Sequence, residues 1–191
     1  MKRSFAIPCL FTIAVLILSG CKQFSEVKPT GARKIAGNLK VEPAIHWNSF
    51  SRNNNEVWTV DGTLLNALSF LTAIDDKKSL LAEGTPGEPP VFKKGMREGD
   101  IVDLYEATLI FRKFSQVQTT GLRPAEVSGK PAFRFDFSAF DPQGLAKRGT
   151  VLGVIDDDGR LNLVIYQAAK EHYYDLYIDK VEAIMASVEL I

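Results

Sequence analysis

The residue with the most distinctive chemical setting in this sequence is Cys21. The small pair Ser19-Gly20 directly precedes it, an uncharged apolar run covers residues 5–18, and two basic residues stand before that run. A basic start, a short apolar stretch and small residues at its end are typical of a secretion signal. The small pair gives a processing enzyme access to the backbone, and a thiol can accept a lipid group as a nucleophile. We therefore predict cleavage between Gly20 and Cys21 and lipidation of Cys21.

Two other interpretations of the N-terminus are less favoured. A retained transmembrane helix needs about 20 apolar residues, and this run has 14, from 5 to 18. An ordinary signal peptide would carry small residues at alternating positions, whereas the suitable small pair lies against Cys21. The segment Leu18-Ser19-Gly20-Cys21 resembles the lipobox of bacterial lipoproteins. That resemblance implies a signal peptide over 1–20 and a bacterial cell-envelope protein held by its N-terminal lipid, at the outer membrane facing the periplasm rather than at the inner membrane.

Composition excludes several kinds of site. The chain of 191 residues has two cysteines and two histidines. Cys9 would leave with the signal and Cys21 would carry lipid, so no thiol remains for a disulfide, cysteine catalysis or a zinc–thiolate site. With only His46 and His172, a three-histidine metal site is excluded, while a mixed histidine and carboxylate site stays open. We expect neither a metal nor a cofactor.

The charge balance argues against a nucleic-acid partner. Loss of two N-terminal basic residues from the 23 in the chain would leave 21 against 23 acidic residues, so the mature protein has no basic field. The group Lys93, Lys94 and Arg97 could contact anionic lipid headgroups. Acidic residues surround this group, which favours an ordinary solvated surface.

Carboxylates are the remaining candidates for chemistry. Asp61, Asp136 and Asp141 could serve a hydrolase or a small-ligand carrier near a long loop over 75–92. The Asp156–Gly159 stretch lacks the ligand spacing of an EF-hand and instead predicts a hairpin turn. No Gly-x-Ser-x-Gly motif occurs. We therefore favour a non-enzymatic binding or scaffold module with a protein partner in the envelope, and keep the hydrolase or carrier as the alternative.

A weak candidate binding surface comprises Trp58, Asp61, His172 and Tyr173. His172 could lie at the mouth of a groove between the last helix and the sheet, although a solvated helix start is the simpler interpretation. Trp58 could belong to the core or to a surface. Trp47 shares an alternating face with Ile45, which predicts a core position.

Residues 21–43 are polar and lack apolar periodicity, which predicts a flexible tether before a single domain over 44–191. Alternation predicts strands over 45–50 and 56–60, the second ending at an Asp-Gly turn. The segment 64–74 fits either a helix or a strand, and the turns on both sides favour a strand. Residues 75–92 predict a surface loop.

The second half of the chain has clearer periodicity. Apolar spacing and charge order predict a helix over about 100–113, followed by turns around Gly121–Pro124. Strict alternation predicts a strand over 132–140 with Phe133, Phe135 and Phe137 on one face. Two further strands, 150–155 and 161–166, flank the Asp-Gly hairpin. An amphipathic helix over 170–187 carries an apolar stripe, and we predict that this stripe covers the phenylalanine face.

Antiparallel strands with two helices predict an α+β layered domain. The order of elements looks like the fold shared by the PsbP and Mog1 proteins, an antiparallel β-sheet covered by helices. The resemblance is carried by the last 60 residues, namely Phe133-Arg134-Phe135-Asp136-Phe137, the turn at Asp158-Gly159, Tyr166 and the helix ending Ile184-Met185-Ala186-Ser187-Val188. The segment Glu56–Gly62 also looks like the start of small envelope lipoproteins of undetermined activity. Members of this superfold mostly bind other proteins or support assemblies, which implies a binding role, although fold alone does not carry function.

Overall fold

The computed structural model describes residues 24–36, 38–52 and 55–191, which form the predicted α+β fold. The signal peptide predicted over 1–20 and the cleavage and lipidation site at Gly20-Cys21 lie outside the described residues. The helices are α1 (Glu98–Phe111) and α2 (Tyr173–Ala186). The strands are β1 (Ser25–Val27), β2 (Arg33–Ile35), β3 (Leu39–Val41), β4 (Trp47–Arg52), β5 (Asn55–Thr59), β6 (Asn66–Ile74), β7 (Ser115–Val127), β8 (Lys130–Phe140), β9 (Ala146–Ile155), β10 (Leu161–Ala169) and β11 (Glu189–Leu190).

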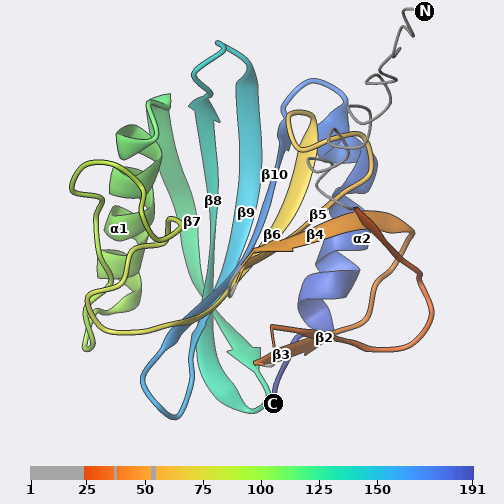
Figure 1. The fold of residues 1–191 in the computed structure, drawn as a ribbon, viewed down its shortest axis with the longest axis horizontal. Helices are drawn as coiled ribbons and strands as arrows, with labels where there is room; N and C mark the ends of the chain where they lie inside the picture. The colour runs from red at the N-terminus through yellow and green to blue at the C-terminus, as the bar shows by residue number, and fades with distance from the viewer. Residues whose placement is uncertain (1–23, 37, 53–54) are drawn as a thin grey trace, which may run out of the picture.

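Among the described residues, eight strands form one sheet in the order β1-β4-β5-β6-β10-β9-β8-β7. Neighbouring strands pair antiparallel throughout. A small second sheet, β11-β3-β2, brings the C-terminal strand beside the N-terminal part of the fold (Figure 1). The C-terminal strand β11 therefore pairs with β3, near the start of the described residues.

The two helices cover opposite faces of the large sheet (Figure 1). The core between α1 and the sheet contains the three phenylalanines of β8 and the helix residues Tyr105 and Leu109. The core on the other face contains the α2 residues Val181 and Ile184, together with both tryptophans and the small sheet. Side chains within the described residues therefore close both cores.

The prediction that α2 covers the phenylalanine face is wrong. Tyr105 of α1 contacts Phe135 and Phe137 edge-on, with ring centroids 5.5 and 5.1 Å apart. Arg134, on the opposite face of the same strand, reaches α2 instead. The alternation correctly divided the strand into two faces, but both faces have a helical cover, so apolar character alone could not match helix to face.

The prediction of a flexible tether is also wrong for the described residues between 24 and 43. This segment supplies β1, β2 and β3, and four of its apolar side chains are buried in the α2-side core: Val27, Ile35, Leu39 and Val41. Arg33 of β2 forms an ion pair of 2.8 Å with the buried Glu56 of β5. Strands of three residues with one or two apolar side chains show too little periodicity to distinguish them from polar linkers.

Residues 66–74 form strand β6, which confirms the strand interpretation of 64–74. A bulge near its end changes the face of the last residue, because Leu163 pairs with Leu71 whereas Leu161 pairs with Ile74. Ala73 within the bulge has φ of 53°. Ile74 consequently joins the α1-side core, while Leu68 and Phe70 belong to the α2-side core.

The turns predicted around Gly121–Pro124 are wrong, because β7 runs through them as a long edge strand. The register of β7 with β8 shifts between Thr120 and Arg123, and Gly121 has φ of +66°. The turn-forming residues therefore produce a bulge within a strand rather than its end.

No helix among the described residues meets the length and hydropathy that crossing a membrane requires.

Candidate functional site

The three carboxylates considered for catalysis do not converge. Asp136 lies on β8 on the same face as Arg134 and pairs with Arg123 at 2.9 Å. Asp61 follows β5 and accepts hydrogen bonds of 2.6 Å from both Asn66 and Tyr177. Asp141 is buried in an ion pair with a lysine on the α1 side. Each carboxylate thus has its own partners, and no two form a pair for acid–base work.

A groove opens on the α1 face of the sheet where the helix leaves the strands uncovered. Its volume is about 440 Å³, within the range of ordinary ligand pockets. Because α1 packs chiefly along β7, no helix of the described residues lies over this face of β4, β5 and β6 (Figure 1). The floor is formed by alternate residues of these strands and β10: Phe50, Val57, Ala67, Ser69, Leu71 and Ile165.

The walls of the groove come from α1 and two connecting segments. Thr108 and Leu109 of α1 line one side, and Leu80 and Leu81 of the long loop line another. The Thr108 hydroxyl donates to the Leu104 carbonyl at 2.7 Å, so its hydrogen is already engaged within the helix. The floor and the wall formed by Leu80 and Leu81 are therefore largely apolar, as suits the binding of an apolar group, while polar side chains such as Thr63 and Gln143 line the remainder of the groove.

A buried ion pair closes one end of the groove. The Lys147 Nζ lies 3.4 Å from Asp141 Oδ2, and the side chains are 2 % and 5 % exposed. Lys147 also donates to the Leu64 carbonyl, while Asp141 accepts from the backbone of Gln143 and Leu145. Since both charges are paired and hydrogen-bonded, this end is polar but electrically balanced.

A cation stands unpaired near the same end. Arg112 follows α1, lines the groove and is exposed, with its guanidinium carbon 5.1 Å from the centre of the Phe114 ring. Within the described part of the chain no carboxylate pairs with Arg112. Gln167 of β10 also lines the groove, and its side-chain amide has no hydrogen-bond partner among those residues. The groove therefore combines an apolar floor with groups able to bind an anionic head.

The predicted binding surface is only partly assembled. Trp58 is fully buried, and its indole nitrogen donates to Glu56 at 2.7 Å, which corrects its assignment to a surface. Asp61 and His172 are exposed, and the His172 ring contacts Tyr173 edge-on. His172 begins α2 with φ of 71°, which agrees with an exposed helix start. Trp47 is buried as predicted.

Tyr177, which was not among the predicted site residues, connects Asp61 of this surface to helix α2. Tyr177 of α2 donates its hydroxyl to Asp61 at 2.6 Å, and its ring lies 6.2 Å from that of Trp47. Burial, followed by the hydrogen bond and charge of Asp61, raises the pKa of Tyr177 to about 12. The pair fixes α2 against the β5–β6 turn. Binding at Asp61, His172 and Tyr173 stays a prediction.

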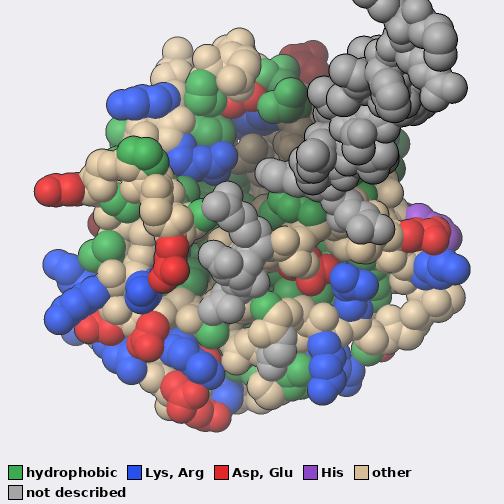
Figure 2. All heavy atoms as spheres, viewed as in Figure 1, with side chains coloured by type: hydrophobic (Ala, Val, Ile, Leu, Met, Phe, Trp, Pro, Cys, Tyr) green, Lys and Arg blue, Asp and Glu red, His purple; other side chains and the backbone are tan. Residues whose placement is uncertain are grey.

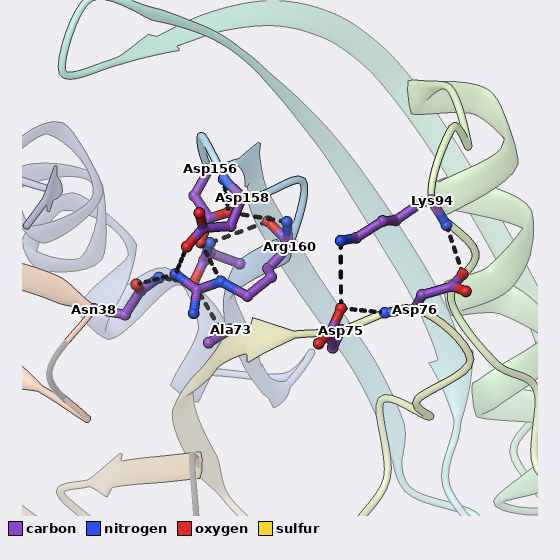
Figure 3. Close-up of polar contacts among 9 residues, drawn as sticks. Asn38, Ala73, Asp75, Asp76, Lys94, Asp156, Asp158 and Arg160 are labelled. Carbon is purple, nitrogen blue, oxygen red and sulfur yellow. Dashed lines mark hydrogen bonds and ion pairs between the residues drawn. The ribbon is translucent and has the colours of Figure 1, made fainter.

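The aspartate-rich hairpin is held by internal contacts (Figure 3). Arg160 pairs with Asp156 at 2.9 Å and with Asp158 at 2.8 Å. The Asn162 side chain accepts hydrogen bonds from Asn38 and from the backbone of Ala73 in the β6 bulge. The described residues include no group of three or more His, Cys, Asp or Glu arranged to hold a metal.

Charge on the surface is mixed rather than concentrated. Lys94 of the predicted basic group lies 3.6 Å from Asp75, and its backbone N–H donates to Asp76 (Figure 3). Basic and acidic side chains intermingle over the face shown in Figure 2.

Sequence reasoning missed the groove and its cation. The alternation in 64–74 was used to identify one face, but Ala67, Ser69 and Leu71 on the other face are less apolar and form the floor. In the sequence, Arg112 is simply a basic residue near the end of the helix predicted over about 100–113. The two consecutive leucines Leu80 and Leu81 in the predicted surface loop are a sign that this loop packs against something. The sequence does not show that they pack at the groove.

Comparison with known proteins shows similarity of fold without similarity of sequence. No family model matches the chain, and no curated protein matches it. The chain is similar to the solution structure of cyanobacterial PsbP (CyanoP) from Synechocystis sp. PCC 6803, with a TM-score of 0.52 and 9 % identity, over 94 % of this chain and 99 % of that one. It is also similar to LpqN of Mycobacterium tuberculosis, described as involved in cell envelope biogenesis, with a TM-score of 0.39 and 12 % identity, over 90 % and 86 % of the two chains.

The first comparison confirms the PsbP-like fold expected from the order of elements. At 9 % identity it shows the fold alone. The TM-score of the second is too low to carry an argument. The function must therefore be argued from the groove and the surfaces of this chain.

Proposed function

We propose that this chain is a non-enzymatic binding module, held at a bacterial envelope by lipid on Cys21, which binds an apolar group in the groove on the α1 face. The observation that carries the proposal is the uncovered floor of β4, β5 and β6. A sheet face with partly exposed Phe50, Val57 and Leu71 stays in contact with water unless something fills it.

The alternative of a hydrolase has less support than that of a carrier. Hydrolysis by carboxylates requires two of them in reach of one substrate, whereas Asp61, Asp136 and Asp141 have separate partners. The groove supports a small-ligand carrier, but in such a carrier the three carboxylates would have no chemical role. A protein partner in the envelope stays a prediction.

The envelope location rests on the N-terminal sequence. The apolar run 5–18 and the pair Ser19-Gly20 before Cys21 support export and lipidation. The outer membrane, facing the periplasm, is the expected site. Metabolic labelling with an acyl precursor tests this step: the parent protein should take up label, and the Cys21→Ala variant should accumulate as unlabelled precursor. A normally processed, detergent-partitioning Cys21→Ala variant would refute lipid attachment.

Binding in the groove is tested with the protein beginning at Lys22, since both cores are closed within residues 24–191. Nile red, an uncharged apolar dye, should gain fluorescence with the parent. Ser69→Phe places a ring on the groove floor and should abolish that gain, while Thr120→Phe, on exposed β7, should retain it. Thermal melting verifies that both variants fold. Equal dye binding by the parent and a folded Ser69→Phe variant would refute the proposal.

A further inference from the structure

The groove lies next to the point where the chain meets its proposed membrane anchor. Phe24 is exposed, and its ring contacts Phe50 edge-on at a centroid distance of 5.6 Å. Phe50 is one of the residues that line the groove floor. Cys21 is three residues before Phe24 in the sequence, and three residues of chain span at most about 11 Å, so a lipid on Cys21 would be tethered to Phe24 by a short length of chain. A lipid on Cys21 therefore holds this end of the groove beside the bilayer.

The apolar floor runs away from the anchor, across the strands. Phe50 is on β4, Val57 on β5, Ser69 on β6 and Ile165 on β10, which are successive neighbours in the sheet. Three inter-strand steps make a path of about 14 Å. The floor is thus elongated and apolar, and its shape suits an extended hydrocarbon chain better than a compact polar molecule.

At the far end of this path lies a positive charge, which determines what kind of head group a bound ligand can have. Gln167 lies on β10, and Arg112 follows α1 with no carboxylate partner among the described residues. The nearby Lys147 is already paired with Asp141. Arg112 therefore leaves one uncompensated positive charge at the groove, and its planar guanidinium matches the two oxygens of a carboxylate.

We infer that the groove takes a single-chain fatty acid from the bilayer to which the protein is anchored, with the acyl chain over the strands and the carboxylate at Arg112. The inference rests on the proposed binding function and adds the ligand class and its source.

The test uses the full lipidated chain in phosphatidylcholine vesicles that contain a diazirine-bearing palmitic acid. After illumination, label should be found in peptides that carry residues 64–71 and 105–114. Replacing Arg112 by Gln should lower this labelling about tenfold, the effect of losing one charge-assisted pair. Lys113→Gln removes a neighbouring exposed charge that does not line the groove, and should leave labelling unchanged.

A diazirine-bearing hexadecanol separates the ligand class from binding itself. We expect it to label the groove weakly and to be insensitive to Arg112→Gln. Equal labelling by the acid and the alcohol would overturn the fatty-acid assignment while leaving an apolar binding module in place. Labelling of the groove peptides by neither probe, or labelling unchanged in a folded Ser69→Phe variant, would overturn both. Because Arg112 is exposed, its replacement tests the head group without disturbing a core.

Discussion

Arg134 of β8 and Glu182 of α2 form a two-pronged ion pair, in which two guanidinium nitrogens donate to the two carboxylate oxygens at 2.5 and 2.7 Å. The hydrogen bonds that Arg134 donates to Glu182 raise the pKa of Arg134. The same guanidinium also donates to Thr150 at 3.1 Å. This contact joins α2 to the face of β8 opposite the three phenylalanines. It therefore shows which face of the sheet α2 covers.

Replacing Glu182 by Gln should destabilise the protein. The side chains of Arg134 and Glu182 are 18 % and 42 % exposed, so solvent screens part of the attraction, and we expect a loss of about 1 kcal/mol in the free energy of unfolding. Urea unfolding measures it. Glu171→Gln removes an exposed charge before α2 and serves as the control. An equal, negligible effect of both substitutions would show that the pair does not hold the helix.

Two cores on opposite faces predict additive effects of mutation. Ile184→Ala should cost about 2 to 5 kcal/mol, because it leaves a cavity in the α2-side core. Phe135→Leu acts on the α1-side core. The double variant should lose the sum of the two free energies within about 0.5 kcal/mol. Coupling well above that value would restore the sequence-based prediction that helix α2 packs on the phenylalanines.

The fold class was predictable because periodicity reports local geometry. Alternation in 132–140 and the helical stripe ending near Ile184 each identify an element and its apolar face. Periodicity does not show which helix packs against which face of the sheet, because both helices have apolar residues to bury. The same limit applies to Val27 and Ile35, whose short strands are stabilised by burial in the α2-side core rather than by their own periodicity.

The groove was less predictable than the elements around it. Its floor exists because α1 lies over β7 and leaves β4 to β6 uncovered, and helix placement is a tertiary property. Ser69 and Gln167 occupy positions that alternation marks as solvated strand faces. Only the packed structure brings them beside Arg112, from another element, at a shared cavity.

A glycine in β9 should be intolerant of a single added methyl group. Gly149 pairs with Phe137 across the strands, and a Cβ at Gly149 would collide with the Phe137 ring and lie 2.5 Å from the Tyr166 carbonyl oxygen. Gly149→Ala should therefore cost about 1 to 3 kcal/mol through overpacking. Gly99→Ala, with open space in the first turn of α1, should be neutral or stabilising. Thermal melting compares them, and equal melting temperatures would contradict the close contact.

The Tyr177–Asp61 hydrogen bond should make stability sensitive to alkaline pH. The folded state holds the pKa of Tyr177 at about 12, above the ordinary value of 10.0, through burial and then Asp61. Because the folded pKa is the higher one, this contribution is fully present below pH 10 and is lost as pH rises through about 12. Tyr177→Phe removes the ionisation, so its free energy of unfolding should fall less steeply than that of the parent over this interval.

Asp61→Asn provides the matched test, because it removes the negative charge but keeps an oxygen that can accept the Tyr177 hydrogen bond. Burial, the larger cause, remains, so the pKa of Tyr177 should move only part of the way back toward 10.0. Tyrosinate absorbance, compared between each variant and Tyr177→Phe, follows this group. If Asp61→Asn titrates like the parent throughout, the carboxylate does not act on Tyr177, and the contact between α2 and the β5–β6 turn is not maintained in solution.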